Sequence, residues 1–321
     1  MAFGFVFPGQ GSQSVGMLGA LAAAEPAVRA TFDEATGVLG YDLWKLVAEG
    51  PEAELNATAR TQPALLAAGV ATWRAWRARG GALPAVVSGH SLGEFTALVV
   101  AEALEFHAAL ALVRYRGEVM QEAVPAGTGA MAAILGLEDA DVEAACREAQ
   151  VSGGPGAVVE AANFNSPGQV VIAGETAAVE RAIAAAKARG AKRALMLPVS
   201  VPSHTSLMRG AGERLRGELS ATALKAPVIR YVSAVDAAAH SEPQEIRDLL
   251  VRQLSSPVRW GQTLRALSES GLEEIIECGP GRVLTGLNRR IERRAGLEFL
   301  ALEDPAAIGV ALEATRGDGN A

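Results

Sequence analysis

The chain has 321 residues, half of them hydrophobic, and a formal net charge of -7 at pH 7. This acidic balance argues against general nucleic-acid binding, and no uninterrupted apolar stretch is long enough to cross a membrane. Its two cysteines, Cys146 and Cys278, predict neither a disulfide framework nor a thiolate metal cluster. The first residues, MAFGFVFPGQ, lack the basic start and long apolar segment of a signal peptide, so a reducing cytoplasm is the expected location.

The first predicted strand covers residues 4–7 and leads into the loop PGQGSQ at 8–13. A glycine-rich loop after an N-terminal strand can bind a dinucleotide, but the third glycine of that motif would fall at Ser14 and no clear second strand leads to an acidic residue. We favour a loop whose backbone amide faces a reactive serine elsewhere in the chain. A plain connecting turn would explain the glycines but not Gln10 and Gln13.

A strand, a sharp turn and a helix are predicted over residues 84–100, PAVVSGHSLGEFTALVV. An apolar run precedes the turn, and apolar residues at offsets of three and four follow it. The turn has the pattern Gly89-x-Ser91-x-Gly93, which places a serine hydroxyl at a tight apex where flanking side chains would clash. The amides of the following helix start would point at an oxyanion formed there. The short pattern also occurs by chance, but the flanking strand and helix favour a nucleophile.

Helices are predicted at residues 62–79 and 106–123, with the tryptophans of the first in the core. Arg116 lies in the second helix among apolar neighbours. It could bind a carboxylate bidentately in a cleft, or it could extend its guanidinium to solvent, as we expect for Arg114. Periodicity does not choose between these interpretations.

Residues 128–198 predict a small subdomain of a different kind. The expected order is strand, helix, strand, strand, helix, strand, which is the ferredoxin-like pattern. Segments rich in proline and glycine bound it at 125–129 and 198–202. We therefore predict a ferredoxin-like insert at 128–198 within a larger domain made of residues 1–127 and 199–321.

The larger domain continues after the insert with alternating helices and strands. Helices are expected at 203–219, 243–254, 261–270 and after GPG at 279–281, and strands at 228–235, 273–278 and 299–302. This alternation implies a largely parallel sheet covered on both faces.

A serine hydroxyl needs a base to become a nucleophile at pH 7, and the chain has four histidines. His90 adjoins Ser91 and should leave the turn in another direction, His107 lies near a helix start, and His240 lies in a polar segment where we expect it to be exposed. His204 lies at the seam between insert and main domain, where clefts form. Elimination favours His204 as the base, although a lone histidine is more often structural.

Seven motifs, in order along the chain, carry a resemblance to a known family. They are FPGQGSQ (7–13), GHSLGE (89–94), RGEVMQ (116–121), GTGAM (127–131), NFNSPGQ (163–169), PSH (202–204) and GPG (279–281). The chain resembles the malonyl-CoA:acyl-carrier-protein transacylases of bacterial fatty-acid synthesis and the acyltransferase domains of polyketide synthases. The resemblance implies a hydrolase-like α/β core with a ferredoxin-like insert.

The resemblance also implies roles for individual residues. Ser91 would attack the thioester of malonyl-CoA and carry the malonyl group, with His204 as the general base and then the acid. The backbone amides of Gln10 and Leu92 would form the oxyanion hole.

Arg116 would pair with the free carboxylate of malonate. The main-chain carbonyl of Gln253 would orient the histidine in place of an Asp, and no Asp is clearly placed for an ordinary triad.

The expected partners are malonyl-CoA, as substrate, and acyl carrier protein. No cofactor, metal, nucleic acid or membrane is implied, and a monomer is expected. The family's carrier is acidic, so an acidic enzyme needs a local basic patch. Lys192-Arg193 and Arg289-Arg290 are the candidates, with ordinary solvated charges as the alternative.

Three other functions compete with malonyl transfer in fatty-acid synthesis. A stand-alone acyltransferase serving a polyketide synthase in trans shares the same chemistry. A serine hydrolase would release the acyl group as a free acid, but Arg116 and the pair Gln10 and Gln13 favour transfer. An idle carrier-docking module predicts a lost nucleophile or base, whereas Ser91 and His204 are both present.

Overall fold

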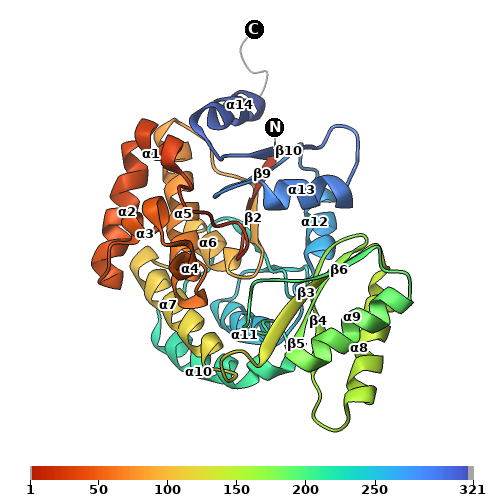
Figure 1. Cartoon of the computed structure of the whole chain (residues 1–321). Helices are drawn as coiled ribbons and strands as arrows, with labels where there is room; N and C mark the ends of the chain where they lie inside the picture. The colour runs from red at the N-terminus through yellow and green to blue at the C-terminus, as the bar shows by residue number, and fades with distance from the viewer. Residues whose placement is uncertain (1, 317–321) are drawn as a thin grey trace.

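In the computed structural model, which describes residues 2–316, a six-stranded sheet is built from strands that precede and follow residues 129–196 (Figure 1). In spatial order its strands are β10 (Glu298–Ala301), β9 (Glu274–Glu277), β1 (Phe3–Phe7), β2 (Val86–Gly89), β7 (Arg230–Val232) and β8 (Ala239–His240). All neighbouring pairs are parallel except β7 with β8. The predicted, mainly parallel sheet is therefore confirmed.

Helices cover both faces of this sheet, which explains the continuous apolar sequence of β1. Phe5 packs its ring against Trp76, with centroids 5.4 Å apart, on the face covered by α5 (Thr58–Ala78), α6 (Gly93–Val100) and α7 (Phe106–Gln121). Val6 points to the opposite face, in the apolar cluster that contains residues of α12 (Trp260–Ser268) and α13 (Val283–Ile291). Figure 1 shows these two groups of helices on opposite sides of β1 and β2.

The remaining helices outside residues 129–196 lie around this core. They are α1 (Gly19–Ala24), α2 (Pro26–Leu39), α3 (Leu43–Glu49), α4 (Glu52–Leu55), α10 (Arg209–Ala221), α11 (Pro243–Gln253) and α14 (Pro305–Thr315). Helices α3, α4 and α14 and the short strand β8 were not predicted from the sequence. Among residues 2–316, no helix is both long and apolar enough to cross a membrane.

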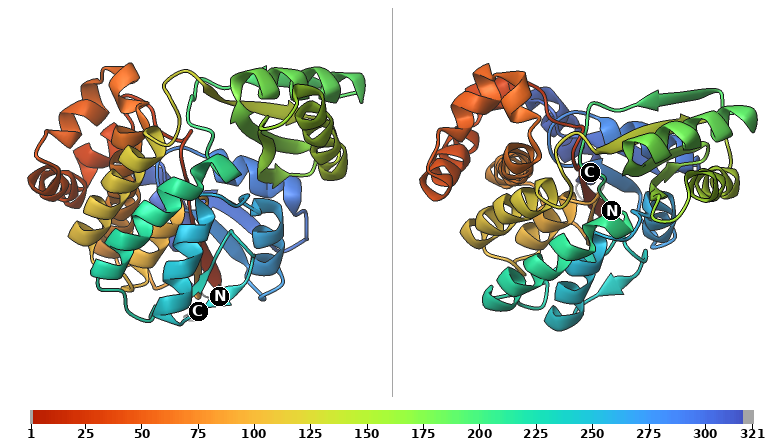
Figure 2. Two further views of the ribbon diagram at one scale, coloured as in Figure 1. Left: turned by 90° about the horizontal axis from the view of Figure 1, so that it is seen from below. Right: turned by 60° about the horizontal axis from the view of Figure 1, so that its bottom comes forward.

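A second, antiparallel sheet lies between residues 129 and 196. Its strands, in spatial order, are β4 (Val159–Ser166), β5 (Gln169–Glu175), β3 (Gly129–Leu135) and β6 (Arg193–Met196). Helices α8 (Asp139–Gly153) and α9 (Thr176–Ala188) share an apolar core with this sheet, separate from the cores of the larger domain. In both views of Figure 2 this part, in green, lies on the opposite side of the molecule from the N-terminal helices, in red to orange.

Two predicted elements are wrong in extent. The helix predicted from Ser203 begins only at Arg209, after a 3-10 turn at Ser206–Met208, because His204 has a left-handed φ of 65° that a helix cannot accommodate. The strand predicted at 228–235 ends at Val232, because the Ser233 amide donates to the Ala238 carbonyl and closes a turn.

Candidate active site

The turn between β2 and α6 places Ser91 at a strained apex. Ser91 has a φ of 52°, in the left-handed region that L-residues rarely adopt. A Cβ at Gly89 would overlap the backbone of Gly93, and a Cβ at Gly93 would overlap the Phe7 carbonyl of β1. Both glycines are therefore required sterically, as the pattern predicted, and the serine hydroxyl stands clear of the sheet.

The loop after β1 packs directly on this turn. A Cβ at Gly9 would overlap the carbonyl oxygen of His90, so the two backbones touch. The backbone amides of Gln10 and Leu92 donate to no other protein atom among residues 2–316, which leaves both free for an oxyanion. Gln13 fastens the loop, since its Oε1 accepts from the Gly11 amide at 2.8 Å.

Ser91 and His204 meet across the seam between the two sheets. The Ser91 Oγ lies 2.8 Å from His204 Nε2, and the Nδ1 of the same ring lies 2.8 Å from the Gln253 carbonyl oxygen. A carbonyl can only accept, so Nδ1 carries the hydrogen and Nε2 is free to accept the Ser91 proton. The left-handed backbone of His204 is held by a bond from its amide to the Leu254 carbonyl, at 3.0 Å.

The electrostatics of the site keep His204 neutral. Burial, followed by the positive charge of Arg116, lowers the pKa of His204 to about 3. At pH 7 the imidazole is therefore available as a base. A neutral histidine that is held by a carbonyl can activate a neighbouring serine as a nucleophile, and no carboxylate is needed.

Arg116 is buried at the floor of the site, so the interpretation of a solvent-directed side chain is wrong. It is 1% exposed, and it donates to Gln62 Oε1 and Gln253 Oε1 at 2.8 Å each and to Ser91 Oγ at 3.2 Å. Its Nε has no partner in the described part of the chain. Burial lowers the pKa of Arg116 to about 10, and the charge of Glu94 opposes that shift, so the guanidinium stays charged at pH 7.

Sequence reasoning missed Gln62 and the side chain of Gln253. Gln62 lies on the same face of α5 as Leu65 and Leu66, and a buried polar residue on an apolar face was the available signal. The Gln253 side chain donates from Nε2 to the Ser91 carbonyl at 3.0 Å while its Oε1 faces Arg116. One residue therefore contacts the nucleophile, the base and the arginine.

The other three histidines lie outside this arrangement. His90 points away from Ser91, with its Nε2 2.9 Å from Asn165 Oδ1. His107 pairs with Glu34 at 2.7 Å on the surface. The expectation that His240 is exposed is wrong, because its side chain is 17% exposed and lies against Asp236. Among the described residues, no group of three or more His, Cys, Asp or Glu side chains could hold a metal ion.

The two predicted basic pairs border the turn between β4 and β5. Arg290 donates to Gln169 at 2.9 Å, and the Gly136 amide donates to the Gly168 carbonyl of the same turn at 2.8 Å. The side chain of Lys192 lies against Gly136. Both pairs therefore lie near the same end of the strands of the antiparallel sheet.

The chain is similar to known proteins over nearly its full length. The family model for the acyl transferase domain matches residues 4–295. The malonyl CoA-acyl carrier protein transacylase of Salmonella typhimurium is 54% identical over 310 residues, which cover 97% of this chain and 98% of that protein. The solved structure of the transacylase of the same name from Coxiella burnetii superposes with a TM-score of 0.94 at 47% identity and covers 98% of this chain and 97% of that one.

A second similar structure contains a partner protein. It is a malonyl-transacylase in complex with a type II polyketide synthase acyl-carrier protein, with a TM-score of 0.94 and 52% identity. It covers 98% of this chain and 100% of that one.

Proposed function

The chain belongs to the family of malonyl CoA-acyl carrier protein transacylases, and we propose that it transfers the malonyl group from malonyl-CoA to acyl carrier protein in fatty-acid biosynthesis. The transfer is ping-pong and passes through a malonyl-serine on Ser91. The support is a nucleophile, a neutral base and a buried cation that meet at one point.

In the first half-reaction, the Ser91 Oγ attacks the thioester carbonyl and His204 Nε2 accepts its proton. The amides of Gln10 and Leu92 donate to the developing oxyanion. The carbon–sulfur bond then breaks, and the imidazolium returns the proton to the leaving thiolate of CoA. The result is a malonyl ester on Ser91 and free CoA.

The second half-reaction runs the same steps in reverse with a different thiol. His204 accepts the proton of the carrier's phosphopantetheine thiol, whose sulfur attacks the ester carbonyl. The bond between the carbonyl carbon and the Ser91 oxygen breaks, and the oxygen recovers the proton from His204. The Gln253 carbonyl keeps the ring in the required tautomer through both halves.

The observation that carries the malonyl assignment is the position of Arg116. Its Nη2 lies 3.2 Å from the Ser91 oxygen that would carry the acyl group. A guanidinium so close to the ester favours an acyl chain whose carboxylate is only one carbon beyond the carbonyl. An acetyl group would offer the buried cation no anion.

The same ion pair favours transfer over hydrolysis. A malonate carboxylate on Arg116 would hold the ester in one pose and occupy space next to the ester that water would otherwise enter. The side chains of Arg116 and His204 are buried, and Ser91 is partly exposed, so water reaches the site from one side at most.

We also propose the organisation behind this site. Residues 1–127 and 199–321 form a hydrolase-like core, and residues 128–198 form a ferredoxin-like insert whose element order and antiparallel sheet support that description. The nucleophile, the base and the arginine meet without any residue of a second copy, and we propose a monomeric enzyme.

The test separates transfer from hydrolysis. The chain is loaded with malonyl-CoA, freed of excess substrate, and then divided between buffer and the phosphopantetheinylated carrier. We expect rapid malonyl transfer to the carrier and slow release of free malonate in buffer. Equal rates of malonate release in both samples would identify a hydrolase.

A second candidate is supply of malonyl groups to a polyketide synthase. The similar transacylase in complex with a type II polyketide synthase carrier favours it. The same loaded enzyme, offered a fatty-acid carrier and a polyketide carrier in competition, should prefer the fatty-acid carrier under our main proposal.

A further inference from the structure

We propose that Glu94 is the positioning residue for Arg116: its buried carboxylate fixes the Gln253 amide so that the amide oxygen faces the guanidinium, and it thereby sets the preference for acyl groups that carry a carboxylate. The inference rests on the proposed malonyl transfer and concerns the shell of residues behind that site.

Glu94 is the only charged residue of helix α6. It lies in the first turn of α6, three residues after Ser91, and its side chain is completely buried. Carboxylates are seldom buried without charged or hydrogen-bonding partners, because the loss of their hydration is costly. The acyl transfer steps make no use of Glu94, so its position needs another explanation.

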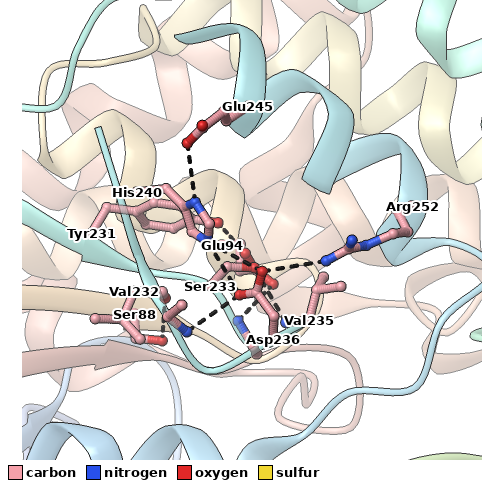
Figure 3. Close-up of polar contacts among 12 residues, drawn as sticks. Ser88, Glu94, Tyr231, Val232, Ser233, Val235, Asp236, His240, Glu245 and Arg252 are labelled. Atoms are coloured by element: carbon pink, nitrogen blue, oxygen red, sulfur yellow. Dashed lines mark hydrogen bonds and ion pairs between the residues drawn. The ribbon is translucent and has the colours of Figure 1, made fainter. Parts of the chain in front are cut away.

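Three donors surround the Glu94 carboxylate, and none of them is charged. The Tyr231 hydroxyl donates to Oε2, while Gln253 Nε2 at 2.9 Å and the Ala234 amide at 3.3 Å donate to Oε1. Figure 3 shows Glu94 next to Tyr231 and close to Ser233 of the turn that follows β7. Burial raises the pKa of Glu94, and the bonds from Tyr231 and Gln253 oppose that rise. All three groups donate to the carboxylate, and only the Tyr231 hydroxyl could also accept a hydrogen bond. These surroundings therefore favour the ionised form of Glu94.

The bond to Gln253 determines which way that amide points. A carboxylate only accepts, so it binds the NH2 group of Gln253 and turns the amide oxygen toward Arg116 Nη2, 2.8 Å away. A flipped amide would place its oxygen against the carboxylate and its NH2 against the guanidinium. Both contacts would be repulsive, so Glu94 and Arg116 together fix one orientation.

The second contribution of Glu94 is its charge. Arg116 is buried and has only neutral amide and hydroxyl oxygens as direct acceptors. The negative charge of Glu94, one side chain away, opposes the loss of its proton. Glu94 thus keeps the guanidinium charged while leaving its donors free to exchange neutral partners for a substrate carboxylate.

The test uses two variants of the full chain and one readout. Glu94→Gln removes the charge and offers Gln253 either a donor or an acceptor, so only the Ser91 carbonyl and Arg116 still hold the amide in its orientation. Glu94→Asp keeps a charged, acceptor-only group on a shorter stem. The readout is the ratio of kcat/KM for acyl-enzyme formation from malonyl-CoA to that from acetyl-CoA.

We expect Glu94→Gln to lower this ratio about tenfold, the effect of losing one hydrogen bond to a charged group, and Glu94→Asp to retain part of it. In an Arg116→Ala background, neither change should lower the ratio further, because Glu94 acts through Arg116. Folded Glu94→Gln with the native ratio would overturn the proposal, as would a fall of equal size in both backgrounds. If Glu94→Gln does not fold, the same comparison with Glu94→Asp decides.

Glu277 provides a matched control, because it is also a completely buried glutamate. Its carboxylate accepts from the Leu284 and Thr285 amides at the start of α13, at 3.0 and 2.7 Å, away from the site. Glu277→Gln should lower Tm and leave the malonyl-to-acetyl ratio unchanged. Failure of the native chain to form a malonyl adduct would refute the proposed function itself, whereas a native preference that survives Glu94→Gln refutes only this inference.

Discussion

Replacing Arg116 by alanine is the sharpest test of how the site selects its acyl group. The guanidinium is buried, charged and within 3.2 Å of the Ser91 oxygen. A malonate carboxylate bound there would gain two hydrogen bonds to a charged group, each contributing roughly 1.5–3 kcal/mol. Loss of about 3 kcal/mol in the transition state lowers kcat/KM for malonyl loading by about 100-fold.

Acetyl loading should move in the opposite direction, because the site no longer holds an unpaired cation. The assay is acyl-enzyme formation from malonyl-CoA and acetyl-CoA, followed by rapid quench and intact mass. Arg114→Ala is the matched control, since Arg114 lies on the same helix, is 43% exposed and pairs only loosely with Glu118 at 3.7 Å. A folded Arg116→Ala enzyme that keeps the native malonyl preference would refute the carboxylate-binding role.

Three further predictions concern the base, the turn and the carrier. The folded-state pKa of His204 lies below its unfolded value, so the native chain loses stability as pH falls through the unfolded pKa. Between pH 7.5 and 5.5 this residue lowers the free energy of unfolding by about 1.4 kcal/mol. Urea unfolding should show that this loss disappears in His204→Gln. Gly93→Ala pushes a methyl group into the Phe7 carbonyl and should destabilise the chain by more than about 2 kcal/mol in the same assay; a neutral effect would contradict the close approach. Replacing Arg289 and Arg290 together by Glu should raise the carrier's KM severalfold and spare malonyl loading from CoA; equal effects on both half-reactions would remove the docking role.

Much of this site was predictable because its residues lie in short motifs with steric reasons. The clash that makes Gly89 necessary is local to a five-residue turn, so the sequence alone indicates where the nucleophile stands, whereas Gly93 is required by the Phe7 carbonyl of the neighbouring strand. Elimination among four histidines then favoured His204, which does lie 2.8 Å from Ser91.

What could not be predicted depends on contacts between distant segments. Arg116 was ambiguous because its burial results from Gln62 and Gln253, which lie 54 and 137 residues away. The shell behind the site was missed for the same reason, since Glu94 meets Tyr231 and Gln253 only through the order of strands in the sheet. The helix start after His204 was misplaced because a left-handed residue leaves no composition signal.

The most direct test of the account is the intact mass of the chain after incubation with malonyl-CoA, compared with the Ser91→Ala variant. We predict a single malonyl adduct on the native chain that disappears when the carrier is added, and no adduct on Ser91→Ala. A native chain that remains unmodified, or a Ser91→Ala chain that carries the same adduct, would contradict the proposal that Ser91 carries the acyl group between the two thiols.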